Sequence, residues 1–269
     1  MARNWKRGVL KMLHLGQKSE YIETYTPELL FPIARNSAQS FFGFDLWHAY
    51  ELSWLNSKGK PEVCVAEFVF PCQSLFLIES KSFKLYLNSF NQTQVESMGK
   101  LAEILQADLS KACGATVEVK LKDLKQVNSE SFQALSGVCL DDLDIACDTY
   151  QVNPDYLTTE NNSVSETVYS HLLKSNCPVT DQPDWASIEI TYSGKKINHA
   201  GLLRYIVSFR DHQDFHEHCV ESIFTDIWQR CAPQNLTVAA YYTRRGGLDI
   251  NPVRASHEIA HYSKRLWRQ

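Results

Sequence analysis

The sequence lacks any apolar run of the roughly 18 to 20 residues that a membrane-spanning helix needs. Its basic N-terminal stretch carries Lys11 and His14 inside the only apolar segment there, and it has no small-residue cleavage site. We therefore expect no membrane span and no secretory leader, and we predict a cytoplasmic protein.

An excess of positive charge is also missing. The 269 residues include 27 Lys and Arg against 31 Asp and Glu, which gives a net charge of −4. Without an overall positive charge the chain has little electrostatic attraction for phosphate backbones or anionic membranes. We therefore expect no direct binding of nucleic acid. The hydrophobic share of 44% and the charged share of 22% are those of an ordinary globular protein and exclude wholesale disorder.

Several familiar motifs are absent. The eight cysteines include no Cys-x-x-Cys pair, which excludes a zinc ribbon. A chain of this length does not need disulfide staples, so we expect free thiols. No Gly-x-Gly-x-x-Gly or Gly-Lys-Ser/Thr loop occurs, which disfavours Rossmann and P-loop nucleotide sites.

The two halves of the chain show the same order of patterns. In the first half, residues 50–71 alternate like a hairpin around a turn at 57–60, and a helical region follows from near Ser82. Leu101, Leu105 and Leu109 then recur at helical spacing, and residues 115–121 alternate like a strand.

In the second half a shorter hairpin is expected over residues 188–197, with its turn at Ser193 and Gly194. Residues 203–209 resemble the segment that ends at Ser89 and Phe90, an apolar helix follows over residues 215–231, and residues 236–242 form a strand. We predict an α+β protein with two modules, residues 1–150 and 151–269, joined near residues 150–165. A single irregular α+β domain is the alternative.

Cys177 has the setting best suited to a reactive cysteine. It follows the strand-like run 168–173, and Asp181 and Asp184 lie shortly after it. A thiolate is a strong nucleophile, but an ordinary thiol has a pKa of about 8.5 and needs a polarised, accessible site. The other cysteines mostly have apolar neighbours, which core packing explains. From the residues alone, Cys177 is the best candidate nucleophile of the eight.

A polar cluster begins the last predicted helix, at His212, His216, Glu217, His218 and Glu221. The first two histidines are four residues apart and share a helix face, so a metal site must be weighed. The His-Glu-x-x-His pattern is absent, and a polar helix start is the simpler interpretation. A ring nitrogen beside a carboxylate can also orient a heterocycle.

Two further stretches carry charge in a distinctive pattern. Residues 79–86 read Glu-Ser-Lys-Ser-Phe-Lys-Leu-Tyr, which also suits a capping box or a solvated helix start. Residues 244–249 place a Gly-Gly turn beside two arginines. Arginine binds phosphate by paired hydrogen bonds and glycine lets a ligand approach the backbone, although a surface turn explains this stretch equally well.

Together these stretches resemble the 7-cyano-7-deazaguanine reductases, the nitrile reductases of queuosine biosynthesis. Residues 79–86 match that family's nicotinamide-cofactor signature at every position. Residues 171–177, 182–185, 215–217 and 243–252 match further family motifs, so the resemblance covers nearly all of the chain after residue 45.

The resemblance implies two tandem tunnelling-fold (T-fold) modules, with antiparallel sheets and helices packed on one face. It implies that Cys177 adds to the nitrile carbon as a thioimide and that Asp184 donates a proton. It further implies a homodimer, NADPH as cofactor and no metal. The implied contacts to the base are Ile78, Glu79, Ser80, His216 and Glu217, and those to the cofactor are Ser80, Lys81, Arg245 and Gly246.

The chemistry of a nitrile explains why the family needs these residue types. Thiolate addition makes the carbon part of a C=N bond that an acid can protonate, and two hydride deliveries from NADPH then give 7-aminomethyl-7-deazaguanine. One alternative is a metal-dependent pterin- or GTP-type T-fold hydrolase, with zinc on Cys177, His212 and His216. Another is a non-catalytic purine-binding module.

Overall fold

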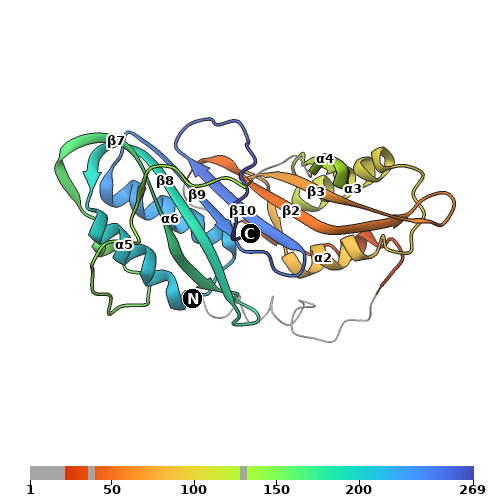
Figure 1. The fold of residues 1–269 in the computed structure, drawn as a ribbon, viewed down its shortest axis with the longest axis horizontal. Coiled ribbons are helices and arrows are strands. Elements are labelled where there is room, and N and C mark those ends of the chain that lie inside the picture. The colour runs from red at the N-terminus through yellow and green to blue at the C-terminus, as the bar shows by residue number, and fades with distance from the viewer. Residues whose placement is uncertain (1–21, 36–39, 128–131) are drawn as a thin grey trace. The chain divides into compact units, whose positions relative to one another are not determined.

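The computed structural model describes residues 22–35, 40–127 and 132–269 (Figure 1). The chain divides into two compact units. Unit 1 consists of Met1–Asn36, Trp47–Glu130 and Arg245–Leu248, and unit 2 of Ser37–Leu46, Ser131–Arg244 and Asp249–Gln269. Helices and mainly antiparallel strand pairs occur in both units, which confirms the predicted α+β class.

Among its described residues, unit 1 combines short and long strands with the helices α2, α3 and α4. Two of its strand pairs, β1 with β4 and β3 with β5, are antiparallel. The hairpin expected around residues 57–60 joins β2 to β3, and the N–H of Asn56 donates to the carbonyl of Lys60 across it (2.9 Å). The elements are η1 (Pro27–Leu29), β1 (Pro32–Ala34), most of β2 (Phe42–Leu55), β3 (Pro61–Pro71), β4 (Phe76–Ile78), α2 (Ser80–Asn88), α3 (Met98–Cys113), β5 (Glu118–Lys122) and α4 (Leu124–Val127).

The core of unit 1 is aromatic where α2 meets the sheet. The ring of Phe83 on α2 lies 5.2 Å from that of Trp47 on β2 and 5.1 Å from that of Phe68 on β3. The leucine spacing predicted for α3 is confirmed, because all three leucines are buried. Ser97 caps the start of this helix, and Gly114 ends it with a φ of 71°. The apolar faces of α2 and α3 are thus both buried.

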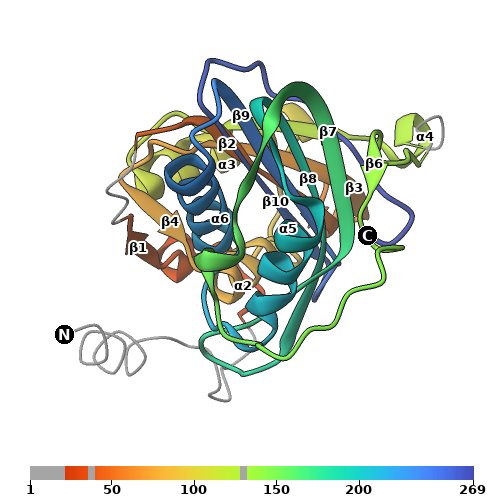
Figure 2. The ribbon, with the colours of Figure 1, turned by 90° about the vertical axis from the view of Figure 1, so that its left-hand side faces the viewer.

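Unit 2 is built on long strands. Within it the strand order is β10-β9-β8-β7-β6, antiparallel except for the parallel pair of β6 and β7. Helices α5 and α6 lie along one face of these strands (Figures 1 and 2). The elements are β6 (Val138–Cys139), η2 (Pro154–Tyr156), β7 (Thr159–Asn176), β8 (Pro183–Ile197), α5 (His199–Val207), η3 (Ser208–Asp211), α6 (His216–Cys231), β9 (Asn235–Tyr242) and most of β10 (Leu248–Ala255).

The short hairpin predicted over residues 188–197 is wrong. Ser193 and Gly194 lie inside β8, which pairs with β7 along most of its length, and residues 159–165 of the expected joint are the start of β7. Gly194 has a φ of 147°, so the strand uses glycine for a local irregularity and not for a reversal. The true reversal between β7 and β8 covers residues 177–182.

The two units share helix lengths and a tyrosine–aspartate hydrogen bond between helices. The helices α2 and α5 each have 9 residues, and α3 and α6 each have 16. Tyr86 on α2 donates to the carboxylate of Asp108 on α3 (2.6 Å), and Tyr205 on α5 donates to that of Asp226 on α6 (2.6 Å). Each pair of helices is therefore tied together in the same way.

Among the described residues, no helix has both the length and the apolar character needed to cross a membrane.

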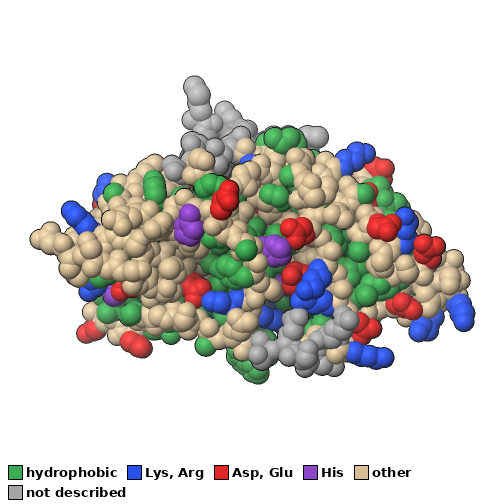
Figure 3. All heavy atoms as spheres, turned by 90° about the horizontal axis from the view of Figure 1, so that it is seen from above, with side chains coloured by type: hydrophobic (Ala, Val, Ile, Leu, Met, Phe, Trp, Pro, Cys, Tyr) green, Lys and Arg blue, Asp and Glu red, His purple; other side chains and the backbone are tan. Residues whose placement is uncertain are grey.

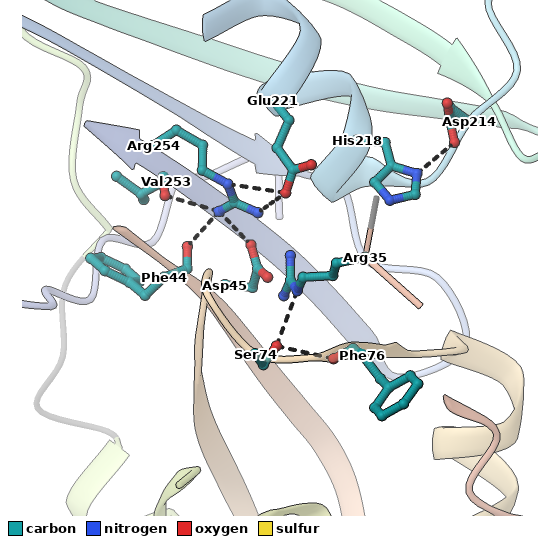
Figure 4. Close-up of polar contacts among 10 residues, drawn as sticks. All are labelled: Arg35, Phe44, Asp45, Ser74, Phe76, Asp214, His218, Glu221, Val253 and Arg254. Carbon is teal, nitrogen blue, oxygen red and sulfur yellow. Dashed lines mark hydrogen bonds and ion pairs between the residues drawn. The ribbon is translucent and has the colours of Figure 1, made fainter. Parts of the chain in front are cut away.

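A fully buried arginine organises unit 2 (Figure 4). The guanidinium of Arg254 on β10 donates to the carboxylates of Asp45 (2.7 Å) and Glu221 on α6 (2.8 Å). It also donates to the carbonyls of Phe44 (3.2 Å) and Val253 (2.9 Å). Because both carboxylates are buried as well, the three charges need one another to stay in the interior.

We predict that Arg254→Met strongly destabilises the fold. The substitution leaves two buried carboxylates without a cation, and breaking a buried ion pair in this way costs about 3 to 5 kcal/mol. Urea unfolding followed by circular dichroism measures the change. Arg230→Met is the matched control, because Arg230 is paired with Asp155 at the surface and exposed pairs contribute little. Equal losses of unfolding free energy in the two variants would contradict the role given to Arg254.

Candidate active site

Cys177 lies on the turn between β7 and β8, directly after the last residue of β7. Its N–H donates to the carbonyl of Gln182 (2.9 Å), and its carbonyl accepts from the N–H of Asp181 (3.1 Å). The thiol is free and half-buried. The predicted position of Cys177 at a strand end is confirmed, and the two backbone hydrogen bonds fix the turn that carries it.

The same turn is tied to the segment before α6. The N–H of Asn176 donates to the carbonyl of His212 (2.8 Å), and the N–H of Asp214 donates to the carbonyl of Asn176 (3.3 Å). Asn176 and Gln213 thereby form a parallel bridge. The residue before Cys177 is therefore held against the segment that leads into α6.

Asp184 and His216 meet within unit 2. Asp184 is the second residue of β8 and only 4% exposed, and His216 is the first residue of α6. The Nε2 atom of His216 lies 3.4 Å from Oδ2 of Asp184, and its ring lies 3.9 Å from the ring of Tyr242. Glu217, the next residue on α6, is also buried. Unit 2 thus brings the carboxyl group of Asp184 on β8 next to the imidazole of His216, which is followed on α6 by a second buried carboxyl group.

A second histidine–aspartate pair stabilises the start of α6. Oδ1 of Asp214 accepts from the N–H of Phe215 (2.9 Å) and lies 3.0 Å from Nδ1 of His218 (Figure 4). Burial opposes the charged forms of both side chains, but their hydrogen bond and mutual attraction outweigh it. The pKa of Asp214 is therefore lowered and the pKa of His218 is raised from their ordinary values. Sequence reasoning did not single out Asp214 as a partner of His218.

In unit 1, Glu79 caps α2 with its own side chain. Its Oε1 accepts from the N–H of Lys81 (2.9 Å) and its Oε2 from the N–H of Ser82 (2.7 Å). Burial raises the pKa of Glu79, while these two hydrogen bonds oppose the rise. The capping interpretation of this stretch is therefore right for Glu79, and the cap also fixes where its carboxylate points. Ile78 ends β4 and Ser80 begins α2, on either side of it.

The turn that follows Arg245 lies against the same helix of unit 1. The N–H of Arg245 donates to the carbonyl of Leu248 (2.9 Å), and Gly246 has a φ of 57°. A side chain at Gly246 would come within 2.5 Å of Nζ of Lys84 on α2. Lys84 is part of the signature, but sequence reasoning assigned it no role. Unit 1 thus brings the glycine turn and a lysine of the signature into contact.

The alternative of a zinc site has no arranged set of ligands in the part of the chain that the structure describes. There, no three side chains of His, Cys, Asp or Glu are grouped so that they could hold an ion. On the face drawn in Figure 3, Lys and Arg side chains are interspersed with Asp and Glu. Charge of both signs is therefore mixed on that face.

Comparison with known proteins supplies the class and then the family. The family model described as "Nitrile reductase, 7-cyano-7-deazaguanine-reductase N-term" matches residues 21–121, and the one described as "QueF-like protein" matches residues 183–261. The class defined by these matches is that of nitrile reductases. Among solved structures, an archaeosine synthase QueF-Like in the apo form aligns with a TM-score of 0.32 and 16% identity, over 38% of this chain and 99% of its own.

Curated relatives are similar over almost the whole chain. An NADPH-dependent 7-cyano-7-deazaguanine reductase of Azoarcus sp. is 54% identical over 90% of both chains, and that of Dechloromonas aromatica is 54% identical over 91% of both. The protein of the same name from Hydrogenovibrio crunogenus is 53% identical over 95% of this chain and 96% of its own. The chain belongs to the family of NADPH-dependent 7-cyano-7-deazaguanine reductases.

The pairing of His218 with Asp214 predicts a pH dependence of stability. Because the folded protein holds the pKa of His218 above its ordinary value of about 6.5, protonation stabilises the fold below that pH, and this contribution is lost as pH rises through the raised pKa. We expect the free energy of unfolding to fall between about pH 6 and pH 8 more steeply in the wild type than in His218→Gln. Urea unfolding across this range measures it. His257→Gln, at an exposed histidine, should retain the wild-type slope; a wild-type slope in His218→Gln would contradict the prediction.

Proposed function

We propose that this chain reduces the nitrile of 7-cyano-7-deazaguanine to 7-aminomethyl-7-deazaguanine with NADPH, in queuosine biosynthesis, through a thioimide on Cys177. The observation that carries the proposal is the 54% identity to NADPH-dependent 7-cyano-7-deazaguanine reductases over nine-tenths of the chain. The geometry of unit 2 supports it, because the half-buried thiol shares a hairpin with the buried Asp184, next to His216.

The proposed reaction begins when the thiolate of Cys177 adds to the nitrile carbon while Asp184 gives a proton to the nitrile nitrogen. The product is a thioimide, with one new C–S bond and one new N–H bond. NADPH would be held by Ser80, Lys81, Arg245 and Gly246 and would supply the two hydrides that the reduction needs. With one further proton on the nitrogen and the thiolate of Cys177 released again, the nitrile becomes an aminomethyl group.

The donor edge of the base is proposed to meet buried carboxylates. Glu217 and His216 serve this role from unit 2, and Glu79 serves it from unit 1 with its neighbours Ile78 and Ser80. Both glutamates are buried at fixed helix starts, which favours discrimination. An analogue without matching donors would leave acceptor positions of these buried carboxylates unfilled, and such a mismatch is costly.

For the cofactor we propose contacts from Ser80, Lys81, Arg245 and Gly246, with Lys84 as an addition. The residues suit a phosphate-bearing group, because a glycine in the left-handed region brings a bare backbone turn next to a lysine amine. Arginine adds a planar donor pair for phosphate. Lys84 also lies 3.8 Å from a carboxylate oxygen of Glu51, which holds its amine beside the turn.

Each half of the chain is proposed to be a T-fold module, residues 1–150 and 151–269, and the protein is proposed to act as a homodimer in the cytoplasm without binding nucleic acid directly. The matched helix lengths and the shared tyrosine–aspartate hydrogen bond support the repeat. The net charge of −4 supports the absence of a nucleic-acid surface.

We expect Cys177→Ala and Cys177→Ser to abolish both NADPH oxidation and the covalent adduct, because neither side chain offers a thiolate. Intact-mass spectrometry with 7-cyano-7-deazaguanine alone should show a nearly stoichiometric adduct in the wild type. Cys147→Ala is the control, since it removes another half-buried thiol of unit 2. Turnover near the wild-type rate in Cys177→Ala, or an adduct on another cysteine, would refute the mechanism.

We also expect NADPH to be preferred over NADH, and Arg245→Ala to reduce that preference. Loss of a charge-assisted contact to the 2′-phosphate should raise the KM for NADPH about tenfold or more while leaving that for NADH nearly unchanged. Steady-state kinetics with both cofactors tests this, with the surface variant Arg230→Ala as control. Equal efficiency of both cofactors in the wild type would remove the basis of the prediction.

A further inference from the structure

Four polar side chains are buried between the strands of unit 2 and helix α6. Ser175 on β7 lies directly opposite Asp184 on β8, so their side chains share one face of the sheet. Tyr242 on β9 lies opposite Ala186, two residues along β8, and therefore belongs to the same face. Cys219 of α6 is the fourth, and all four are almost completely inaccessible to solvent.

The hydroxyl groups of Ser175 and Tyr242 are unusual within this layer. Neither makes a hydrogen bond of normal geometry with any residue that the structure describes, although both oxygen atoms are buried. Their polar neighbours are each other and the thiol of Cys219, which affect one another's pKa through weak side-chain hydrogen bonds. Weakly paired buried hydroxyl groups are costly, and apolar side chains of similar shape would avoid that cost.

The four groups are close enough to influence one another electrostatically. Burial is the main cause of the raised pKa values of Cys219 and Tyr242, and the charge of Asp184 raises both further. The hydroxyl of Ser175 acts in the opposite direction on both. His216 is a further titratable side chain beside Asp184, and its ring lies on that of Tyr242. The charge of Asp214 also raises the pKa of Cys219.

We propose that Ser175 and Tyr242 are positioning residues for Asp184, and that their hydroxyl groups turn to donate to its carboxylate once its proton has passed to the substrate nitrogen. The inference rests on the proposed role of Asp184 as the proton donor. A hydroxyl hydrogen can rotate freely and needs no movement of the backbone. The two donors stabilise the anion that the proton transfer creates in a buried place.

This arrangement gives a reason for a cluster of weakly paired hydroxyl groups in the interior. As the proposed proton donor, Asp184 is protonated before the transfer. Afterwards its oxygen atoms bear a charge in a buried place, and Ser175 and Tyr242 present hydroxyl groups on the same face of the sheet. Tyr242 has a second function through its ring, which supports the imidazole of His216 and so the position of that side chain as well.

The test compares Tyr242→Phe and Ser175→Ala with the wild type and with Tyr241→Phe. Tyr242→Phe removes the hydroxyl but keeps the ring under His216. Tyr241 is the matched control, because it is the neighbouring buried tyrosine on β9 and donates to Glu189, away from Asp184. The measurements are kcat and KM for 7-cyano-7-deazaguanine across pH, with circular dichroism to confirm folding.

We expect each hydroxyl variant to lose about 10- to 100-fold in kcat with a KM within about twofold of the wild type. Because a lost donor raises the pKa of Asp184, the alkaline limb of the kcat profile should move to higher pH. Tyr241→Phe should retain the wild-type profile. If Tyr242→Phe fails to fold, Ser175→Ala alone decides the matter.

Wild-type kcat and an unmoved alkaline limb in the folded hydroxyl variants would overturn the inference. Asp184→Asn separates this failure from that of the proposed mechanism. If Asp184→Asn is inactive while both hydroxyl variants behave like the wild type, only the positioning role falls. If Asp184→Asn is as active as the wild type, Asp184 is not the proton donor and both fall together.

Discussion

The buried charge of Arg254 is the constraint on which the site in unit 2 depends. Three buried charges remain in an interior only where their geometry lets them neutralise one another, so this contact favours one position of α6 relative to β10. Glu221 lies one turn beyond Glu217 on the same helix. Fixing Glu221 therefore also fixes the first turn of α6, which carries His216 and Glu217.

The short segment that leads into α6 connects this helix to the turn that carries Cys177. Its backbone pairs with Asn176, the residue before Cys177, while Asp214 holds the helix start through Phe215 and His218. The thiol, the carboxyl group of Asp184 and the imidazole of His216 thus all rest on regular elements or on a turn pinned by backbone hydrogen bonds. Sites held on such rigid supports keep their geometry more precisely than sites on long loops.

Local sequence patterns predicted those helices and strands whose formation depends mainly on neighbouring residues. The leucines of α3, the helix after Phe215 and the strand end before Cys177 all follow from periodicity. The full length of β7 was missed, because residues 159–167 are polar and do not alternate. The strand β10 was read only as a family motif, since Asn251 and Arg254 are buried polar residues whose partners are distant in sequence. Such partners are visible only in the folded chain.

The candidate site likewise contains some residues that the sequence predicted and others that it did not. Cys177 stood out from its polar neighbours, but the roles of Asp184, Glu79 and Glu217 came from the resemblance, because a single carboxylate in a sequence carries no signal of its function. Lys84 was passed over although it lies in the signature, and Asp214 and Tyr242 were not singled out at all. What distinguishes Tyr242 is a buried hydroxyl group on the same face of the sheet as Asp184, a property of packing that a sequence does not display.

The two units differ at helix starts that hold the same place in the order of their elements. Glu79 caps α2, whereas the corresponding cap of α5 is Asn198. Glu217 is the second residue of α6, whereas the second residue of α3 is Gly99. Each unit therefore keeps a carboxylate at only one of the two equivalent positions, and each of the two carboxylates proposed for the base comes from a different unit.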